Sequence, residues 1–226
     1  MQMIKVFGLM TGLTVLLVGA GAYLGGQGGA ILMFVLAAVM NFGSYWFSDR
    51  MVLRMYRARI VERADAPELY GMVERLARRA ELPTPTVAIA PQPQPNAFAT
   101  GRNPQNGVVC FTEGILRALP LEELEGVTAH ELAHIKHRHM LVGTIAATFA
   151  GAITMLAGIA RWALILGTGR DSDRNPLGEL VLLIVAPLAA VIIQMAVSRQ
   201  NEFEADATAA RITGTPRGLA GALRRL

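Results

Sequence analysis

A long apolar stretch occupies the N-terminal part of the chain, where residues 6–48 contain no charged side chain. As a helix this stretch would extend about 65 Å at ~1.5 Å per residue, roughly twice the ~30 Å hydrocarbon core of a bilayer. The run Gly25-Gly26-Gln27-Gly28-Gly29 interrupts it, and glycine-rich runs oppose helix and favour a reversal. The pattern predicts two transmembrane helices, at residues 7–24 and 30–47. A signal peptide is the alternative for the first, since Lys5 precedes it and Ala20-Gly21-Ala22 has the small residues of a cleavage site.

Two further uncharged runs follow at residues 140–160 and 180–197. Each is long enough to cross a bilayer, and a membrane helix tolerates Pro187 when its neighbours satisfy the freed carbonyl. A buried core helix is the alternative for both runs. The apolar pattern therefore predicts a predominantly α-helical membrane protein with about four transmembrane helices.

Basic residues give the expected orientation of these helices. They follow the second span, precede the third and follow the fourth, and they are absent from the glycine-rich connection: Arg50, Arg54, Arg57, Arg59, Arg63, Lys136, Arg138 and Arg199. Arg161, Arg170 and Arg174 oppose this bias without cancelling it. By the positive-inside rule the termini and residues 49–139 are cytoplasmic.

Composition supports the membrane assignment and removes one class of partner. Apolar residues make up 53% of the chain and charged residues 17%, against roughly 25% charged in an ordinary soluble domain. Because the basic residues lie beside the spans and lack interleaved aromatic residues, no nucleic-acid partner is expected. Cys110 is the only cysteine, which excludes an intramolecular disulfide and suits the cytoplasm. In its apolar run we expect it to pack in a core rather than act as a nucleophile.

Between the second and third spans the pattern becomes that of a small α+β domain. Apolar positions at helical spacing after Pro67 predict a helix that closes at Leu82-Pro83. Three strands are expected after it, at residues 86–90, 96–100 and 107–112. A short helix at residues 113–119 and a long helix at residues 121–139 should follow them.

The long helix contains the pattern His130-Glu131-Leu132-Ala133-His134. Histidines four positions apart project from one helix face, so both can bind one ion, while Glu131 can reach a metal-bound water without binding the metal. This spacing is typical of zinc metalloproteases, although five residues alone also match unrelated helices. His137 shares the face of His130, but three ligands along one straight helix cannot surround an ion. We expect His137 to have an interfacial or supporting role.

The third ligand should therefore be a carboxylate from elsewhere, and residues 198–206 are the best source. Read as a helix, this segment has Glu202 and Asp206 on one face, with Glu204 pointing away from both. One carboxylate can bind the metal while the other accepts the second N–H of a ligating histidine. A solvated acidic face is the alternative. Two crossings separate His134 from Glu202, so both residues lie on the same side of the membrane.

These motifs resemble the HtpX-like membrane zinc metallopeptidases, a family related to the CAAX prenyl proteases. The resemblance covers nearly the whole chain and rests on the paired N-terminal spans, the Asn96-Ala97-Phe98-Ala99-Thr100-Gly101 segment, the two-histidine motif, and Ser198-Arg199 with Glu202-Phe203-Glu204-Ala205-Asp206. It implies one zinc ion per chain held by His130, His134 and Glu202. It also implies Glu131 as general base and Asp206 as the support of a ligating histidine.

The implied function is hydrolysis of misfolded or damaged membrane proteins on the cytoplasmic side of a bacterial inner membrane. Asn96, Ala97, Phe98 and Ala99 would bind an extended substrate by strand addition, with an ordinary edge strand as the alternative. A CAAX-type or peptide-processing peptidase and a non-catalytic zinc-binding scaffold are the alternative functions. Because the family's sequences continue beyond Leu226, we expect the oxyanion-stabilising residue there or in an unassigned segment.

The expected organisation has four parts. Residues 1–48 form two transmembrane helices, and residues 49–140 form a cytoplasmic α+β domain of the zincin type. Residues 141–197 form the third and fourth transmembrane helices, and residues 198–226 form a cytoplasmic helix with the third ligand.

Overall fold

The computed structural model describes residues 2–165 and 199–226, with the backbone alone for residues 159–165. The described residues fall into two compact units, one of residues 3–44 with 143–165 and one of residues 45–142 with 199–226. The predicted fourth membrane helix, at residues 180–197, lies outside the described residues.

The first unit contains most of the helical segment α1 (Gln2–Met55), which consists of two helices joined at Gly25 and Gly26. Gly26 has a φ of 57°, a backbone conformation that glycine adopts at no steric cost. The break therefore falls where the glycine run predicts it. The two arms contact each other, because the Asn41 side-chain amide donates to the Met10 carbonyl at 3.2 Å.

Helix α5 (His139–Ile165) packs on both arms of α1 within this unit. Ala152 of α5 forms a fully buried cluster with Leu13 and Leu17 of the first arm and Ala37 of the second. The hydroxyl groups of Ser44 and Thr148 lie 2.8 Å apart. Small and hydroxyl side chains thus allow close contact between otherwise apolar helices.

The outer surface of these helices is apolar. Large side chains that are more than half exposed follow both arms of α1: Phe7, Val15, Leu24, Ile31, Leu32, Phe34, Val39 and Phe42. Contiguous apolar surface of this extent is rare on soluble monomers and suits contact with lipid. Among the described residues, α1 and residues 139–158 of α5 are long and apolar enough to cross a membrane.

The second unit is built on a four-stranded mixed sheet. Its strands are β1 (Arg59–Ile60), β2 (Thr86–Ala90), β3 (Ala97–Thr100) and β4 (Val108–Thr112), in the spatial order β1-β2-β4-β3. β2 and β4 are parallel, whereas β3 pairs with β4 and β1 with β2 in antiparallel fashion. The expected strands are confirmed to within one residue, and β1 is too short for a sequence pattern to predict it.

Alternate residues of the two central strands face opposite sides of this sheet. Val87, Ile89, Val109 and Phe111 belong to the main core beneath the helices, which also includes the fully buried Leu132 and Ile135 of α4. Ala88, Ala90, Val108 and Cys110 face the other way and pack against side chains at the end of α1, such as Leu53 and Tyr56. Both faces of the central strands are therefore buried, as their continuous apolar sequences require.

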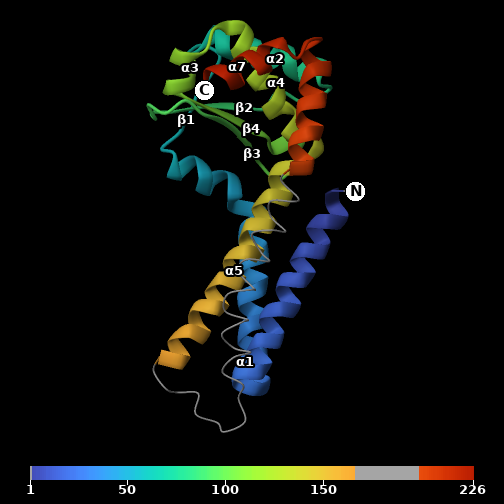
Figure 1. The fold of residues 1–226 in the computed structure, drawn as a ribbon, viewed down its shortest axis with the longest axis vertical. Helices are drawn as coiled ribbons and strands as arrows, with labels where there is room; N and C mark the ends of the chain where they lie inside the picture. Colours follow the sequence, from blue (N-terminus) through green and yellow to red (C-terminus); the bar gives the residue numbers. More distant parts are fainter. Residues whose placement is uncertain (1, 166–198) are drawn as a thin grey trace. The chain divides into compact units, whose positions relative to one another are not determined.

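Helices cover the core face of the sheet (Figure 1). They are α2 (Pro67–Arg79), α3 (Glu113–Ala118), α4 (Leu121–His137), the helical residues 199–213, and α7 (Arg217–Arg225). α4 and α7 approach very closely at Gly126 and Gly218, where a methyl group on either glycine would overlap the backbone of the opposite helix.

One predicted boundary is wrong. The pattern favours an unbroken helix over residues 121–139, but α4 ends at His137 and α5 begins at His139. Between them Arg138 has a left-handed conformation with a φ of 58°, and its N–H donates to the carbonyls of His134 and Ile135. Arginine has good helix propensity, so the sequence carries no signal for this single-residue change of direction.

Candidate active site

Helix α4 presents His130 and His134 from one face, and their Nε2 atoms lie 3.0 Å apart. The opposite face of the helix is fixed by the main core, where Ala129, Leu132 and Ile135 have no exposed surface. The spacing of the two imidazoles is therefore set by one helical turn on a well-anchored helix.

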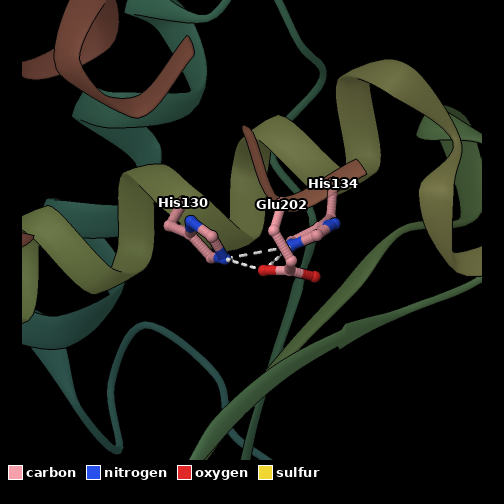
Figure 2. A group of neighbouring side chains, drawn as sticks. All are labelled: His130, His134 and Glu202. Carbon is pink, nitrogen blue, oxygen red and sulfur yellow. Dashed lines mark hydrogen bonds and ion pairs between the residues drawn. The ribbon is translucent and has the colours of Figure 1, made fainter. Parts of the chain in front are cut away.

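Glu202, from the helical residues 199–213, completes a group of three potential metal ligands with these histidines (Figure 2). Its Oε2 atom lies 3.3 Å from His130 Nε2 and 3.8 Å from His134 Nε2. Ligands about 2.0 to 2.1 Å from a tetrahedral zinc ion are separated by about 3.3 Å from one another. The three observed separations lie around this value, so the residues fit a zinc ion.

Asp206 lies one helical turn after Glu202, next to His130. Its Oδ1 atom is 2.9 Å from His130 Nδ1, although the angle of this contact is not that of a hydrogen bond. A small rotation of the ring or the carboxylate would make Asp206 the acceptor for His130 Nδ1–H. A carboxylate in this position fixes which imidazole nitrogen remains available for a metal.

Glu131 is buried beside the potential ligands, with 8% of its surface exposed. Burial raises the pKa of its carboxyl to about 8, a hydrogen bond from the backbone N–H of Ala99 acts in the opposite direction, and the charge of Glu202 raises it further. A divalent cation at the neighbouring ligands would also favour the ionised form. Glu131 is thus a basic carboxylate whose protonation responds strongly to the charge next to it.

His134 is held in its neutral form. Burial lowers the pKa of its imidazole to about 3, with further lowering from the nearby rings of His130, His139 and His137. Only a neutral imidazole has a lone pair for a metal ion. The surroundings of His134 therefore favour the state that a metal ligand requires.

A second group of potential ligands, His137, His139 and Glu204, lies next to the first. Glu204 contacts both histidines, and His139 Nδ1 lies 3.2 Å from His134 Nδ1. From the sequence, Glu204 is expected to point away from the site, and His139 is given no role. Both belong to the site's surroundings because α4 ends at His137, a change of direction that an uninterrupted helical pattern cannot indicate.

The four residues expected to bind substrate lie on or beside β3, an edge strand of the described sheet. Asn96 precedes the strand, and its carbonyl accepts from the Thr112 N–H at 2.9 Å. Hydrogen-bonded pairs alternate along an antiparallel ladder, so the backbone groups of Phe98 also bond to β4. The backbone groups of Ala97 and Ala99 then point away from β4. The Phe98 ring packs on Tyr56, with ring centroids 4.6 Å apart.

Cys110 is fully buried in β4, and burial raises the pKa of its thiol to about 12. A thiol with so high a pKa is a poor nucleophile at neutral pH. This agrees with the expected role in core packing.

Two histidines one turn apart, a converging carboxylate and a buried glutamate beside them form the arrangement of a metalloprotease site. Residues 63–226, which include all of these side chains, match Peptidase family M48. The chain therefore belongs to peptidase family M48, and with its apolar helices it is a membrane metalloprotease.

Curated relatives over the whole chain bear the name Protease HtpX homolog. The protein of Gemmatimonas aurantiaca is 58% identical over 228 residues, covering 100% of this chain and 81% of that protein. The protein of Syntrophotalea carbinolica is 54% identical over 100% of this chain and 81% of its own, and that of Thermococcus sibiricus is 54% identical over 96% and 76%. The resemblance to HtpX-like peptidases is confirmed.

The fold is also similar to a solved structure. The crystal structure of S. mikatae Ste24p superposes with a TM-score of 0.53 at 18% identity, covering 98% of this chain and 56% of that chain. At this identity the similarity concerns the fold alone.

Proposed function

We propose that this chain is a zinc-dependent endopeptidase, with His130, His134 and Glu202 as ligands of one zinc ion and Glu131 as general base. The observation that carries the proposal is the convergence of three ligand atoms, 3.0 to 3.8 Å apart, from two segments distant in the sequence. A buried carboxylate lies beside them in Glu131. Membership of peptidase family M48 supports the same function.

The donor set suits zinc, because two imidazoles and one carboxylate leave the fourth tetrahedral position open. When bound there, zinc lowers the pKa of a coordinated water toward ~7 and polarises the scissile carbonyl. Glu131 accepts the proton of the attacking water on its carboxylate and later delivers it to the leaving amine. The Ala99 N–H lowers the pKa of this carboxylate and so favours its ionised form.

The edge of β3 offers a binding surface for an extended peptide. The backbone groups of Ala97 and the carbonyl of Ala99 point away from β4, so a substrate strand can pair with them beside Glu131, while the Ala99 N–H is directed at the Glu131 carboxylate. Recognition through backbone hydrogen bonds tolerates many side chains. This breadth suits the proposed substrates, misfolded or damaged membrane proteins cleaved on the cytoplasmic side of a bacterial inner membrane.

Two alternative functions use the same residues differently. A CAAX-type or peptide-processing peptidase would share the ligands and the base but accept other substrates. A zinc-binding scaffold would need the ligands without the base, and the burial of Glu131 at an energetic cost favours an enzyme.

The test compares Glu131→Gln with His130→Ala in the purified full chain. Glu131→Gln keeps the shape of the side chain but cannot accept a proton, so we expect one bound zinc and a cleavage rate lower by about 10²- to 10⁴-fold. His130→Ala should lose zinc and activity together. Zinc content is measured beside cleavage of an unfolded membrane protein and of a prenylated peptide, which separates the two peptidase classes. Cleavage by Glu131→Gln within about threefold of the wild type would remove Glu131 as the base.

A further inference from the structure

The side chains of His137, His139 and Glu204 form a cluster that the proposed mechanism does not use. His139 Nε2 lies 3.0 Å from Glu204 Oε2, and His137 Nδ1 lies 3.2 Å from Glu204 Oε1. On its other side, His139 Nδ1 lies 3.2 Å from Nδ1 of His134. His139 is almost fully buried, with 3% of its surface exposed. The cluster thus connects a carboxylate to a proposed zinc ligand through one buried imidazole.

The direction of the hydrogen bonds in this cluster follows from the role of His134. A ligand at His134 Nε2 must present a lone pair, and a neutral imidazole then carries its proton on Nδ1. His134 Nδ1–H therefore donates to His139 Nδ1, which must be unprotonated. The proton of His139 is then on Nε2, where it is donated to Glu204 Oε2.

The contacts described for His137 fit the same direction. Thr208 Oγ1 lies 2.8 Å from an Arg211 guanidinium nitrogen and 3.0 Å from His137 Nε2. Arg211 can only donate, so the Thr208 hydroxyl accepts from it, and the hydroxyl proton is available for His137 Nε2. With that proton accepted at Nε2, His137 carries its own proton on Nδ1, which lies 3.2 Å from Glu204 Oε1. In the described contacts, one carboxylate oxygen of Glu204 accepts from His139 and the other lies next to His137, so no nitrogen has to donate and accept at once.

This proton count argues against a metal ion in the cluster. His137, His139 and Glu204 have the composition of a metal site, and their ligand atoms lie within 4.8 Å of one another. A cation on His139 Nε2 would need that nitrogen unprotonated while Nδ1 accepts from His134, which leaves the ring without any proton. Neutral imidazole cannot meet both demands. Metal ions therefore cannot occupy both groups at once while His139 accepts the hydrogen bond from His134.

We propose that Glu204 and His139 are positioning residues for His134: through two successive hydrogen bonds they fix its tautomer and ring orientation so that Nε2 faces the zinc ion. The inference rests on the proposed role of His134 as a ligand. Acceptors of this kind on a ligand's second nitrogen typically contribute 10- to 100-fold in metal affinity or activity. Asp206 lies next to His130, and Glu204 reaches His134 through His139, so a different acidic residue of the 199–213 helix serves each of the two proposed ligands.

The test is zinc affinity, measured by competition with a chelator on the purified full chain, together with zinc stoichiometry. Glu204→Ala should weaken zinc binding by 10- to 100-fold while the chain still binds one ion at saturation. Glu204→Gln should recover affinity to within a few-fold of the wild type, because its amide oxygen can accept from His139 Nε2–H. His137→Gln should change affinity by less than about threefold, since His137 meets Glu204 through its other oxygen.

The outcomes distinguish failure of this inference from failure of the proposed function. Unchanged affinity in Glu204→Ala, beside loss of zinc in His130→Ala, would overturn the positioning role and leave the zinc site intact. Unchanged affinity in both variants would overturn the zinc site itself. Two zinc ions in the wild type, one of them lost in His137→Gln and in Glu204→Gln, would make the cluster a second metal site. Equal unfolding temperatures of the metal-free wild type and Glu204→Ala are expected, and a large drop would assign Glu204 to folding instead.

Discussion

The backbone N–H of Ala99 donates a hydrogen bond to the carboxylate of Glu131. Ala99 lies on the edge strand β3 and Glu131 on α4, so this bond joins the proposed substrate strand to the proposed base. The geometry of the base therefore depends on the sheet as well as on the helix that carries the ligands.

Replacement of Ala99 by proline removes this donor, and we expect lower catalytic turnover without loss of zinc. The Ala99 N–H points away from β4, so Ala99→Pro leaves the strand pairing intact. A hydrogen bond to a charged group contributes about 1.5 to 3 kcal/mol, which corresponds to roughly 10- to 100-fold in kcat. Ala97→Pro is the matched control on the same edge. It should raise KM and leave kcat nearly unchanged, and equal loss of kcat in both variants would contradict the role of the Ala99 bond.

Removal of the carboxylates of the 199–213 helix should give graded losses of zinc. Glu202→Ala removes a ligand and should abolish stoichiometric binding, whereas Asp206→Ala should weaken it by about 10- to 100-fold. Glu113→Ala is the control and should bind zinc normally. It removes an exposed carboxylate whose only partner in the described contacts is Arg117. Metal analysis after dialysis measures all three. Full zinc content in Glu202→Ala would remove Glu202 from the site.

A methyl group at the contact between α4 and α7 should destabilise the second unit. Gly126→Ala would place a Cβ against the backbone of α7 near Leu219, and overpacking of this kind costs about 1 to 3 kcal/mol. Gly71→Ala in α2 is the control, because a Cβ there meets only the end of the Arg75 side chain at 3.8 Å. That change should stabilise α2 by about 0.5 to 1 kcal/mol. Chemical denaturation of the two variants should therefore shift in opposite directions.

Stability should fall in acid through the contact of Glu123 with Arg225. The two side chains form a two-pronged ion pair at 2.7 and 3.0 Å between α4 and α7, and the Arg225 hydrogen bond lowers the pKa of Glu123 below its usual value near 4.5. A lowered folded-state pKa gives stability that is present above about pH 4.5 and lost as the pH falls through the folded value. Denaturation of wild type and Glu123→Gln across this window checks it. A difference between them that grows in acid would contradict the sign.

The proposed orientation can be tested by thiol labelling without removing the native cysteine, because Cys110 is buried and its pKa is raised to about 12. Gln94→Cys, at an exposed position of the second unit, should react with an impermeant reagent only after the membrane is opened. Asp173→Cys, in the connection after the third predicted span, should react in intact cells. Labelling of position 94 from outside would reverse the topology.

Local patterns in the sequence were sufficient to propose the ligand pair and the base, and they predicted most elements of the second unit. His130, Glu131 and His134 lie within five consecutive residues of one helix, with the two histidines about one turn apart, so their relation follows from helix geometry alone. The strand boundaries hold because apolar residues fill both faces of β2 and β4 and turn residues separate them. The glycine run likewise fixes the break in α1, because the backbone conformation at Gly26 is one that other residues avoid.

Tertiary structure decided which residues surround that helix. The contact of Glu202 with both histidines joins segments far apart in the chain, and periodicity alone could only offer Glu202 or Asp206 as alternatives. The position of Glu204 depends on the left-handed Arg138, which turns the chain so that His137 and His139 both reach its carboxylate. Local propensity carries no trace of that turn, because arginine has good helix propensity and tertiary context, rather than the residue itself, selects the left-handed conformation of Arg138.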